Sequence, residues 1–443
     1  MKPLNEVAEM VGLENLIPCG RNKAKIPLEE IWKKPRKGKI VLVTSINPTP
    51  FGEGKTTTAI GISQALWKIG RKSIVTLREP SLGPLFGVKG GGTGGGRSKV
   101  EPSDDINMHF TGDFHAIQTA HNLLSSMLNN IIYHGNKVRI DRKRIMWGRV
   151  LDINDRSLRN VVVGLGENSG ALVEDFFEIT AASEITAIMA LATNYLDMKS
   201  RLADILVAFT KDKKPFYAKD VKAQGAMAAL LRDALKPNLV QTTEGTPAIV
   251  HIGPFANIAH GHNSLLADEI GLRYSDILVT EAGFGSDLGA EKFVNIVSRE
   301  GNFEVSSAVI VVTAKALKYQ GGVKKKHVRE KNMEALEKGS ANLLRHIEIV
   351  KKLGFKPIIA INRFPEDNES ELNRIVDLVE DNGAKAFLSE VFEKGGEGGI
   401  DIAKEIAKNG SRKPNITYKK DEPIKEKIER IASEIYGANG VDY

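Results

Sequence analysis

The stretch IVLVTSINPTPFGEGKTTT, residues 40–58, runs from an apolar strand through a loop of glycine and proline into the start of a helix. Gly52 and Gly54 allow backbone N–H groups to converge on phosphate oxygens, and the helix that follows offers its positive end. Lys55 can reach the β and γ phosphates of a nucleotide, and Thr56 can ligate magnesium. This order of strand, loop and helix predicts a phosphate-binding loop for MgATP.

One position departs from the usual pattern G-x-x-x-x-G-K-[ST], because Thr49 stands where that pattern has glycine. An ordinary glycine turn before a helix with a surface lysine is the alternative, but the preceding strand and the sequence G-K-T-T-T favour nucleotide binding. The predicted ATP-binding residues of this loop are Thr49, Pro50, Gly52, Glu53, Gly54, Lys55, Thr56 and Thr57.

Buried strands and helices alternate along the rest of the chain. Apolar runs typical of strands occur at 40–46, 73–77, 161–165, 248–252, 276–280, 308–313 and 357–361. Helical periodicity occurs between most of them, for example at 56–69, 183–191 and 332–353. This alternation predicts an α/β fold of the P-loop NTPase-like type, with a mostly parallel sheet flanked by helices and additional α/β parts.

The length of 443 residues exceeds what a single core supports, so we expect more than one domain. Residues 1–322 form the predicted nucleotide-binding major domain, with a mainly helical insertion near 198–240. A glycine pair followed by a basic run, at 322–329, marks the expected boundary. Residues 323–443 then form a second α/β domain.

Composition excludes several classes of protein. The sequence has no apolar run long enough to cross a bilayer and no signal peptide at its start, so we expect a cytoplasmic protein. Cys19 is the only cysteine, so neither an intrachain disulfide nor a cysteine-rich zinc site can form. The net charge of +7 is diffuse, and runs such as 324–326 are typical of solvated surfaces, so no nucleic-acid partner is expected.

A second block, residues 77–117, reads LREPSLGPLFGVKGGGTGGGRSKVEPSDDINMHFTGDFHAI. Seven of the ten residues 87–96 are glycine, and the flanking R-E-P and His/Asp-rich segments favour a substrate-covering loop over a flexible linker. Arg78 lies at the carboxyl end of a predicted strand, where its planar cation can hold a phosphoryl group or an acyl phosphate. A structural salt bridge from Arg78 to Glu79 or another acid is the alternative.

Six of the nine histidines lie in two short stretches, and these are His109, His115, His121, His251, His260 and His262. Their spacings match no common zinc motif, so each is more often a hydrogen-bonded structural residue than a metal ligand. The second stretch, 246–264, follows an apolar strand, and we expect it to line the same cleft as the phosphate loop.

These blocks together resemble formate–tetrahydrofolate ligase, also called 10-formyltetrahydrofolate synthetase. The matching stretches run in family order from residue 46 to residue 441, and they are INPTPFGEGKTTT, LREPSLGPLFGVKGGG, DINMHFTGDFHAI, FEITAASEITAIMALA, HIGPFANIAHGHNS, TEAGFGSDLGAEKF, ALKYQGG, INRF, KGGEGGIDIA and IYGANGV. Thr49 agrees with the family's own form of the loop, N-P-T-P-x-G-E-G-K-T.

The resemblance implies a ligase that forms a C–N bond in two steps. Formate attacks the γ-phosphate of MgATP to give formyl phosphate and ADP, and N10 of tetrahydrofolate then attacks the formyl carbon. Lys55 and Thr56 would hold the phosphates and magnesium, and Arg78 would bind formyl phosphate. His109 and His251 occupy family motif positions near the phosphates. The resemblance therefore implies four catalytic residues, which are Lys55, Arg78, His109 and His251.

The resemblance also implies further ligands and partners. The pterin clamp of the family corresponds here to Phe364 and Phe392, where phenylalanine replaces the family's tryptophan at the second position. Lys315 stands where an arginine is commoner in the stretch that contacts the nucleotide base. Family members are typically homotetramers activated by potassium or ammonium, so we expect a homotetramer or dimer of this chain and a monovalent cation as activator.

Family sequences usually continue past Y-G-A-x-G-V by a further domain-sized segment, whereas this sequence stops at Tyr443. Either the enzyme works without that segment or a separate chain supplies it. A non-catalytic ATP-binding subunit or a nucleotide switch is therefore the alternative function, and it predicts ATP binding without formate-dependent ADP release.

Overall fold

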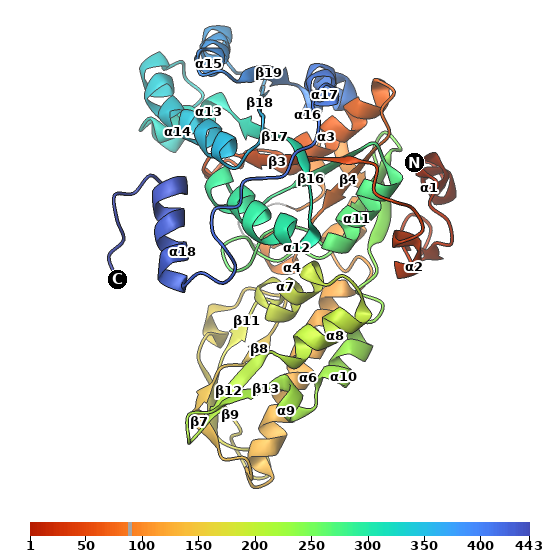
Figure 1. Ribbon diagram of the computed structural model, residues 1–443, viewed down its shortest axis with the longest axis vertical. Coiled ribbons are helices and arrows are strands. Elements are labelled where there is room, and N and C mark those ends of the chain that lie inside the picture. Colours follow the sequence, from red (N-terminus) through yellow and green to blue (C-terminus); the bar gives the residue numbers. More distant parts are fainter. Residues whose placement is uncertain (87–90) are drawn as a thin grey trace.

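The computed structural model describes residues 1–86 and 91–443, and a large sheet forms the centre of its upper part (Figure 1). The strands of this sheet follow the order β1–β2–β14–β15–β4–β16–β3–β17–β18–β19. Seven neighbouring strands are parallel, and these are β15 (Pro247–Val250), β4 (Ser73–Leu77), β16 (Ile277–Glu281), β3 (Lys39–Ser45), β17 (Val305–Val312), β18 (Pro357–Asn362) and β19 (Lys385–Ser389). The predicted mostly parallel sheet flanked by helices is thereby confirmed.

Antiparallel strands complete one end of the sheet. They are β1 (Ile17–Pro18), β2 (Ala24–Lys25) and β14 (Asn238–Thr242), with β6 (Ser98–Glu101) paired to β14 and β5 (Gly94–Gly95) paired to β6. The sequence at 94–101 after the glycine-rich stretch therefore joins the same sheet as the phosphate loop.

The central strands are buried on both faces, which is why they read as continuous apolar runs. Ile40 and Leu42 of β3 pack into one core, while Val41 and Val43 pack into another. The first core lies under α13 (Ala314–Gln320), α14 (Met333–Lys352) and α15 (Glu369–Asp381). The second lies under α3 (Lys55–Lys68) and α17 (Ile400–Ala407). Two helical layers thus hold the sheet between them (Figure 1).

A second lobe extends below the sheet in Figure 1. Its helices are α6 (Asp113–Tyr133), α7 (Glu184–Leu191), α8 (Tyr195–Ala203), α9 (Ala218–Val221) and α10 (Gln224–Leu231). Its strands are β7 (Ile140–Ile145), β8 (Arg149–Val150), β9 (Val161–Val163), β10 (Val173–Asp175), β11 (Phe177–Glu178), β12 (Leu206–Thr210) and β13 (Pro215–Tyr217). The region near 198–240, expected to be mainly helical, therefore also contains strands, because 206–210 and 215–217 pair as a hairpin.

The expected strands and helices fall close to the observed ones, although the strand expected at 161–165 lies outside the central sheet. Strands β18 and β19 extend the sheet formed by earlier residues, and the domain boundary at residue 322 stays a prediction. The remaining α-helices are α1 (Leu4–Val11), α2 (Leu28–Ile31), α4 (Leu82–Leu85), α5 (Ser103–Asn107), α11 (Leu265–Tyr274), α12 (Arg299–Gly301), α16 (Val391–Lys394) and α18 (Ile424–Arg430). Three π-helices, η3 (Ser286–Ala290), η4 (Phe293–Ser298) and η7 (Ile431–Ile435), and the 3-10 helices η1 (Arg156–Leu158), η2 (Thr180–Ala182), η5 (Lys325–His327) and η6 (Gly395–Gly399) complete the helices of the described residues. None of the helices within 1–86 and 91–443 is long and apolar enough to cross a membrane.

Candidate phosphate-binding site at the carboxyl edge of the sheet

The carboxyl ends of the parallel strands bring several segments to one edge of the sheet. A pocket of about 340 Å³ lies there, between the loop after β3, the end of β4 and the segments that follow β15 and β16. Its polar and glycine lining includes Gly52, Glu53, Gly54, Lys55, Thr56, Thr57, Arg78, Glu79, Gly91, Gly92, Gly253 and Glu281. Six of the eight ATP-binding residues predicted in the loop thus line one pocket, and the other two, Thr49 and Pro50, belong to the same loop but not to the lining.

The loop after β3 holds its shape through a buried acid. Oε1 of Glu53 accepts hydrogen bonds from the backbone N–H and the hydroxyl of Thr49, at 3.0 and 2.8 Å. Burial raises the pKa of Glu53, while these hydrogen bonds from Thr49 oppose the rise. Gly52 and Gly54 have φ values of 72° and 78°, which only glycine adopts without strain. Thr49, irregular for the generic motif, is therefore a structural partner of Glu53.

Asn362, at the end of β18, supports the same loop from the other side. Its Nδ2 donates to the carbonyl of Glu53 at 2.8 Å, and its Oδ1 accepts from the hydroxyl of Thr58 at 3.2 Å. A Cβ atom at Gly54 would lie 2.5 Å from this Nδ2, so a substitution there would displace the Asn362 amide and strain the backbone at a φ of 78°. The N-R-F motif, residues 362–364, thus supports the phosphate loop through Asn362 and also contains Phe364.

One carboxylate links the phosphate loop to Arg78. Oε2 of Glu281 accepts a hydrogen bond from the hydroxyl of Thr56 at 2.7 Å, and Oε1 lies 3.4 Å from Nη2 of Arg78. Nζ of Lys55 donates to the hydroxyl of Ser45 at 3.1 Å. The lysine, the arginine and the threonine therefore face one pocket, and the acid that pairs with Arg78 is Glu281 rather than the neighbouring Glu79.

A buried group of charges lies around Glu79, the residue that follows Arg78. Nζ of Lys25 donates to both carboxylate oxygens of Asp113, at 2.6 and 2.7 Å, and Nδ2 of Asn238 donates to Oδ2 of Asp113 at 2.8 Å. Burial, and next the adjacent Asp113, raise the pKa of Glu79 well above its ordinary value, although Lys25 opposes the rise. Glu79 lines the pocket, and its Oε2 has no hydrogen-bond partner within the described residues.

The glycine-rich segment was predicted to cover the substrate. Residues 87–90 of this segment lie outside the described part of the chain. Gly91, Gly92 and Gly94 line the pocket, and the backbone N–H of Gly92 donates to Oδ1 of Asn107 at 3.0 Å. A Cβ atom at Gly96 would lie 2.1 Å from the carbonyl oxygen of Phe392, so the end of this segment packs directly against the predicted pterin clamp.

Lys315, predicted to contact the nucleotide base, and Phe364, one of the two residues of the predicted pterin clamp, meet at a second pocket. This pocket has a volume of about 530 Å³ and is lined by Phe51, Gly52, Thr313, Lys315, Lys325, Lys326, Val328, Arg329 and Phe364. Nζ of Lys315 lies 3.7 Å from the centroid of the Phe364 ring, within range of a cation–π interaction, and 2.7 Å from Oε1 of Glu366. Gly52 lines both pockets, so the two are neighbours.

Phe392 is not among the residues that line this second pocket. It lies on α16, just after β19, and more than half of its side chain is exposed. Phe364 follows β18, the parallel neighbour of β19. The two phenylalanines therefore lie at the same edge of the sheet.

The two histidines predicted to be catalytic occupy different surroundings. His251 is fully buried, and its ring nitrogens lie 2.6 Å from the hydroxyl of Ser264 and 2.8 Å from the carbonyl of Ala234. Burial lowers its pKa to about 4, which keeps the ring neutral. His109 is exposed in the turn between α5 and α6. Neither side chain lines the phosphate pocket.

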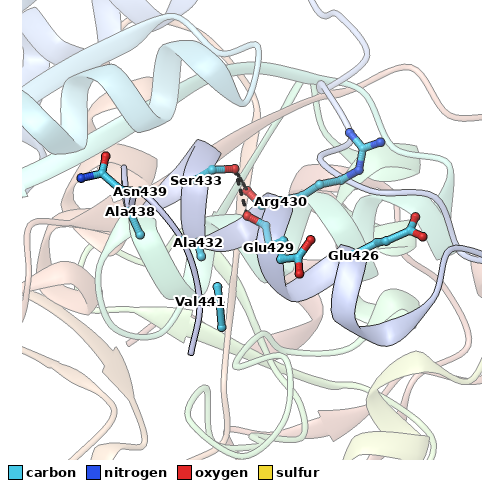
Figure 2. A pocket seen from close by; sticks show the side chains of 9 residues that line it. Glu426, Glu429, Arg430, Ala432, Ser433, Ala438, Asn439 and Val441 are labelled. Carbon is cyan, nitrogen blue, oxygen red and sulfur yellow. Dashed lines mark hydrogen bonds between the residues drawn. The ribbon is translucent and has the colours of Figure 1, made fainter. Parts of the chain in front are cut away.

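Another pocket, of about 490 Å³, lies at α18 and the residues that follow it (Figure 2). Glu426, Glu429 and Arg430 line it, and the hydroxyl of Ser433 donates to the backbone carbonyls of Glu429 and Arg430. It shares no lining residue with the phosphate pocket, and none of the predicted site residues lies in it. We therefore leave it out of the candidate site.

Sequence reasoning missed Glu281, Asn362 and Ser45 as members of the site. A signal for Glu281 was present, because it is the acid that ends the apolar run I-L-V-T after the phosphate loop, and parallel strands place such an acid at the ligand edge. Asn362 and Ser45 carry no comparable signal, since their contacts depend on which strands become neighbours.

Comparison with known proteins gives a single family. A sequence model of the family described as formate–tetrahydrofolate ligase matches residues 1–443. The chain is 53% identical to the formate–tetrahydrofolate ligase of Caldicellulosiruptor saccharolyticus, 54% to that of Thermoplasma volcanium and 51% to that of Thermotoga petrophila. Each alignment covers 100% of this chain and 81%, 82% and 83% of the respective relative.

Proposed function

The chain belongs to the formate–tetrahydrofolate ligase family and catalyses the ATP-dependent ligation of formate to tetrahydrofolate, and we propose that it does so through formyl phosphate held between Lys55 and Arg78. The single observation that supports this route is the convergence of Lys55, Thr56, Arg78 and Glu281 on one pocket. A non-catalytic ATP-binding subunit is not favoured by the family relationship.

In the first step, an oxygen of formate forms a bond to the γ-phosphorus while the bond to the β-phosphate oxygen breaks, and ADP leaves. Lys55 offsets the charge of the β and γ phosphates, and the guanidinium of Arg78 holds the anionic formyl phosphate through its oxygens. Both groups are fixed before the substrates bind, through Ser45 and Glu281, so little reorganisation accompanies the reaction.

Magnesium fits the oxygen groups at Thr56 and Glu281. Mg²⁺ prefers hard oxygen ligands and keeps several waters, so the Thr56 hydroxyl would bind it directly and the Glu281 carboxylate would act through water. When bound, the ion offsets negative charge on the transferring phosphoryl group. The position of Glu281 on the strand next to β3 supports a P-loop NTPase-like arrangement of this sheet.

The acceptor is proposed to bind at the edge of the sheet where Phe364 and Phe392 both lie, with its pterin ring against these two side chains. Aromatic rings stack through their faces, so phenylalanine can serve at both positions. Because Lys315 lies over Phe364, the residues proposed for the adenine base and for the pterin are in contact. Once formyl phosphate has formed, N10 attacks its carbon, the C–O bond to phosphate breaks, and N10 loses its proton.

An activating monovalent cation would find suitable oxygen groups at Glu79 and Asp113. Two carboxyl groups meet there with one lysine, and Oε2 of Glu79 has no partner among the residues described. A potassium or ammonium ion at this position would favour ionised Glu79, the residue next to Arg78 in the chain. We assign His251 to support the 251–264 segment rather than to proton transfer, since both its ring nitrogens are engaged.

We also propose a cytoplasmic homo-oligomer, a tetramer or dimer. Several large apolar side chains are exposed on the second lobe, and Met146, Ile153, Val162, Leu165 and Leu172 are the most prominent around its hairpins. Exposed apolar side chains in this number on one lobe support a surface that another copy covers. Light scattering tests this proposal directly, and a monomer at micromolar concentration would contradict it.

The experiment that tests the proposed route separates the two steps. The purified chain is incubated with formate and MgATP, with and without tetrahydrofolate, and ADP and 10-formyltetrahydrofolate are measured. We expect formate-dependent ADP formation in the absence of tetrahydrofolate, limited to about one equivalent per site, and continuous product formation in its presence. ATP binding without any formate-dependent ADP would contradict the formyl phosphate route.

A further inference from the structure

The motif TEAGFGSDLGAEKF, residues 280–293, contains a lysine with no role in the chemistry described so far. Lys292 lies between the π-helices η3 and η4, and its side chain is partly buried. Its Nζ donates to the carbonyl oxygens of Ala256 and Ala259, at 2.6 and 2.7 Å. A single ammonium group thus holds two peptide groups of one short segment.

This segment, residues 255–259, forms a compact turn. The backbone N–H groups of Ile258 and Ala259 both donate to the carbonyl of Phe255, at 3.3 and 2.8 Å. Phe255 and Ala256 line the phosphate pocket. Since each peptide unit is planar, holding a carbonyl oxygen also fixes the direction of the N–H on the same unit. Lys292 therefore sets the orientation of the peptide planes in one wall of that pocket.

The wall lies directly beside Arg78. A Cβ atom at Gly283 would lie 2.7 Å from Cβ of Ala256 and 2.8 Å from Nη1 of Arg78. Only the backbone of Gly283 therefore lies between Ala256 and the Arg78 guanidinium. A Cβ atom at Gly253 would likewise meet the carbonyl of Glu79 at 2.2 Å and Cβ of Arg78 at 3.5 Å. Displacement of the turn would therefore change the space around the guanidinium.

We propose that Lys292 is a positioning residue, whose ammonium holds the turn 255–259 against Arg78 and so shapes the part of the pocket that receives formate. The inference rests on the proposed role of Arg78. The phosphate loop reaches the pocket from β3 and makes none of these contacts with the turn, so ATP binding is expected to be independent of Lys292. Burial lowers the pKa of Lys292, and the neighbouring Glu291 opposes that effect.

Lys39 provides a matched control for a purely structural lysine. Its Nζ also donates to backbone carbonyls, those of Ile406, Ala407 and Asn409 at the end of α17, at 3.4, 3.1 and 2.5 Å. Burial lowers its pKa too, and its side chain does not line the phosphate pocket. Replacement of either lysine by methionine removes the hydrogen bonds from an ammonium group to backbone carbonyls. Only the carbonyls that Lys292 binds belong to a turn beside Arg78.

The test compares Lys292→Met with Lys39→Met by the KM for formate, the Kd for ATP and the melting temperature. We expect Lys292→Met to raise the formate KM at least tenfold while the ATP Kd changes less than twofold. Lys39→Met should lower the melting temperature and leave the formate KM unchanged. An unchanged formate KM in folded Lys292→Met would overturn the proposal.

A second variant keeps the proposal testable if Lys292→Met does not fold. Lys292→Ala is assayed with added ethylammonium at saturating potassium, so that general activation by monovalent cations is constant. Recovery of at least a third of the wild-type kcat/KM for formate is expected, and absence of any recovery in the folded variant contradicts the proposal. Wild-type enzyme is measured in the same assay. If wild-type enzyme itself does not turn over formate, the result contradicts the proposed formyl phosphate chemistry and not the role of Lys292.

Discussion

The hydroxyl of Thr56 donates to Oε2 of Glu281 at 2.7 Å, although the two residues are 225 positions apart in the sequence. Thr56 lies in the first turn of α3, and Glu281 ends β16, the parallel neighbour of β3. Because Oε1 of the same carboxylate lies near Arg78, this acid is in contact with both the proposed magnesium ligand and the proposed formyl phosphate ligand. Its charge should therefore affect metal affinity and the bound acyl phosphate together.

Glu281→Gln keeps an oxygen that can accept from Thr56 but removes the negative charge. We expect the magnesium concentration needed for half-maximal activity to rise by about 10- to 100-fold, as for other groups that act on a metal through water. Titration of activity with magnesium at fixed ATP measures this change. The exposed Glu304→Gln should behave as wild type, and identical magnesium curves for the two variants would show that Glu281 has no part in metal binding.

Lys55→Ala removes the cation proposed to offset the phosphate charge. We expect kcat to fall by about 10²- to 10³-fold, since preorganised charges at a transferring phosphoryl group contribute on that scale. Formate-dependent ADP formation is the measurement. Lys72→Ala alters an exposed lysine just before β4 and serves as the control. Comparable turnover in both variants would contradict the role given to Lys55.

Gly96→Ala tests the contact between the glycine-rich segment and the pterin clamp. Gly96 has a φ of +57°, and its added methyl group would meet the carbonyl of Phe392, whereas Gly70 has a φ of +76° with no atom within 4 Å. Gly70→Ala should lose about 1 kcal/mol of unfolding free energy from backbone strain alone. Gly96→Ala should lose more, and its KM for tetrahydrofolate should rise while formate-dependent ADP formation persists.

Urea unfolding and steady-state kinetics measure both effects of this substitution. If Gly96→Ala loses only as much stability as Gly70→Ala and keeps the wild-type KM for tetrahydrofolate, the segment does not support Phe392. The pair is matched in backbone conformation, so a difference between the two variants reports the contact alone.

His251 makes stability depend on pH in a defined direction. Its pKa is about 4 in the folded chain, below the ordinary histidine value of 6.5, so between these values the unfolded chain binds more protons. Its contribution is complete above pH 6.5 and is lost as the pH falls toward 4, with a slope of up to about 1.4 kcal/mol per pH unit.

The expected result is a shallower pH dependence of unfolding in His251→Gln than in wild type over that interval. Urea unfolding at several pH values measures it, with the exposed His109→Gln as the control. A wild-type slope in His251→Gln would mean that this ring does not titrate on unfolding. Loss of kcat at pH 8 in stably folded His251→Gln would instead support the catalytic role that the family motif suggests.

Local sequence was sufficient for much of the fold. The runs at 40–46, 73–77 and 357–361 are apolar without alternation, which is the pattern of parallel strands covered on both faces, and all three lie in the central sheet. Strand β19 was missed because its side chains are only partly buried at the edge of the sheet, so its apolar run is broken. The strand at 161–163 reads like a core strand but lies in an exposed hairpin.

Local sequence likewise predicted part of the candidate site, and the rest depended on tertiary contacts. The phosphate loop was predictable because a single contiguous segment supplies the strand end, both glycines, the lysine and the threonine. Arg78 was predictable from its place after a strand. The acidic partner of Arg78 was not predictable. The neighbouring Glu79 lies in the buried group around Asp113, whereas Glu281 belongs to a strand about 200 residues later in the chain.

By itself, the sequence determined the phosphate loop, the alternation of strands and helices, and the family. Each of these depends on residue types, or on a hydrophobic period, within short contiguous segments. Only the tertiary structure decided that Glu281 pairs with both Thr56 and Arg78, that Lys315 lies over Phe364, and that Lys292 holds the turn beside Arg78. The reason is physical, because these contacts depend on the order of strands in the sheet, and that order follows from packing of the whole chain.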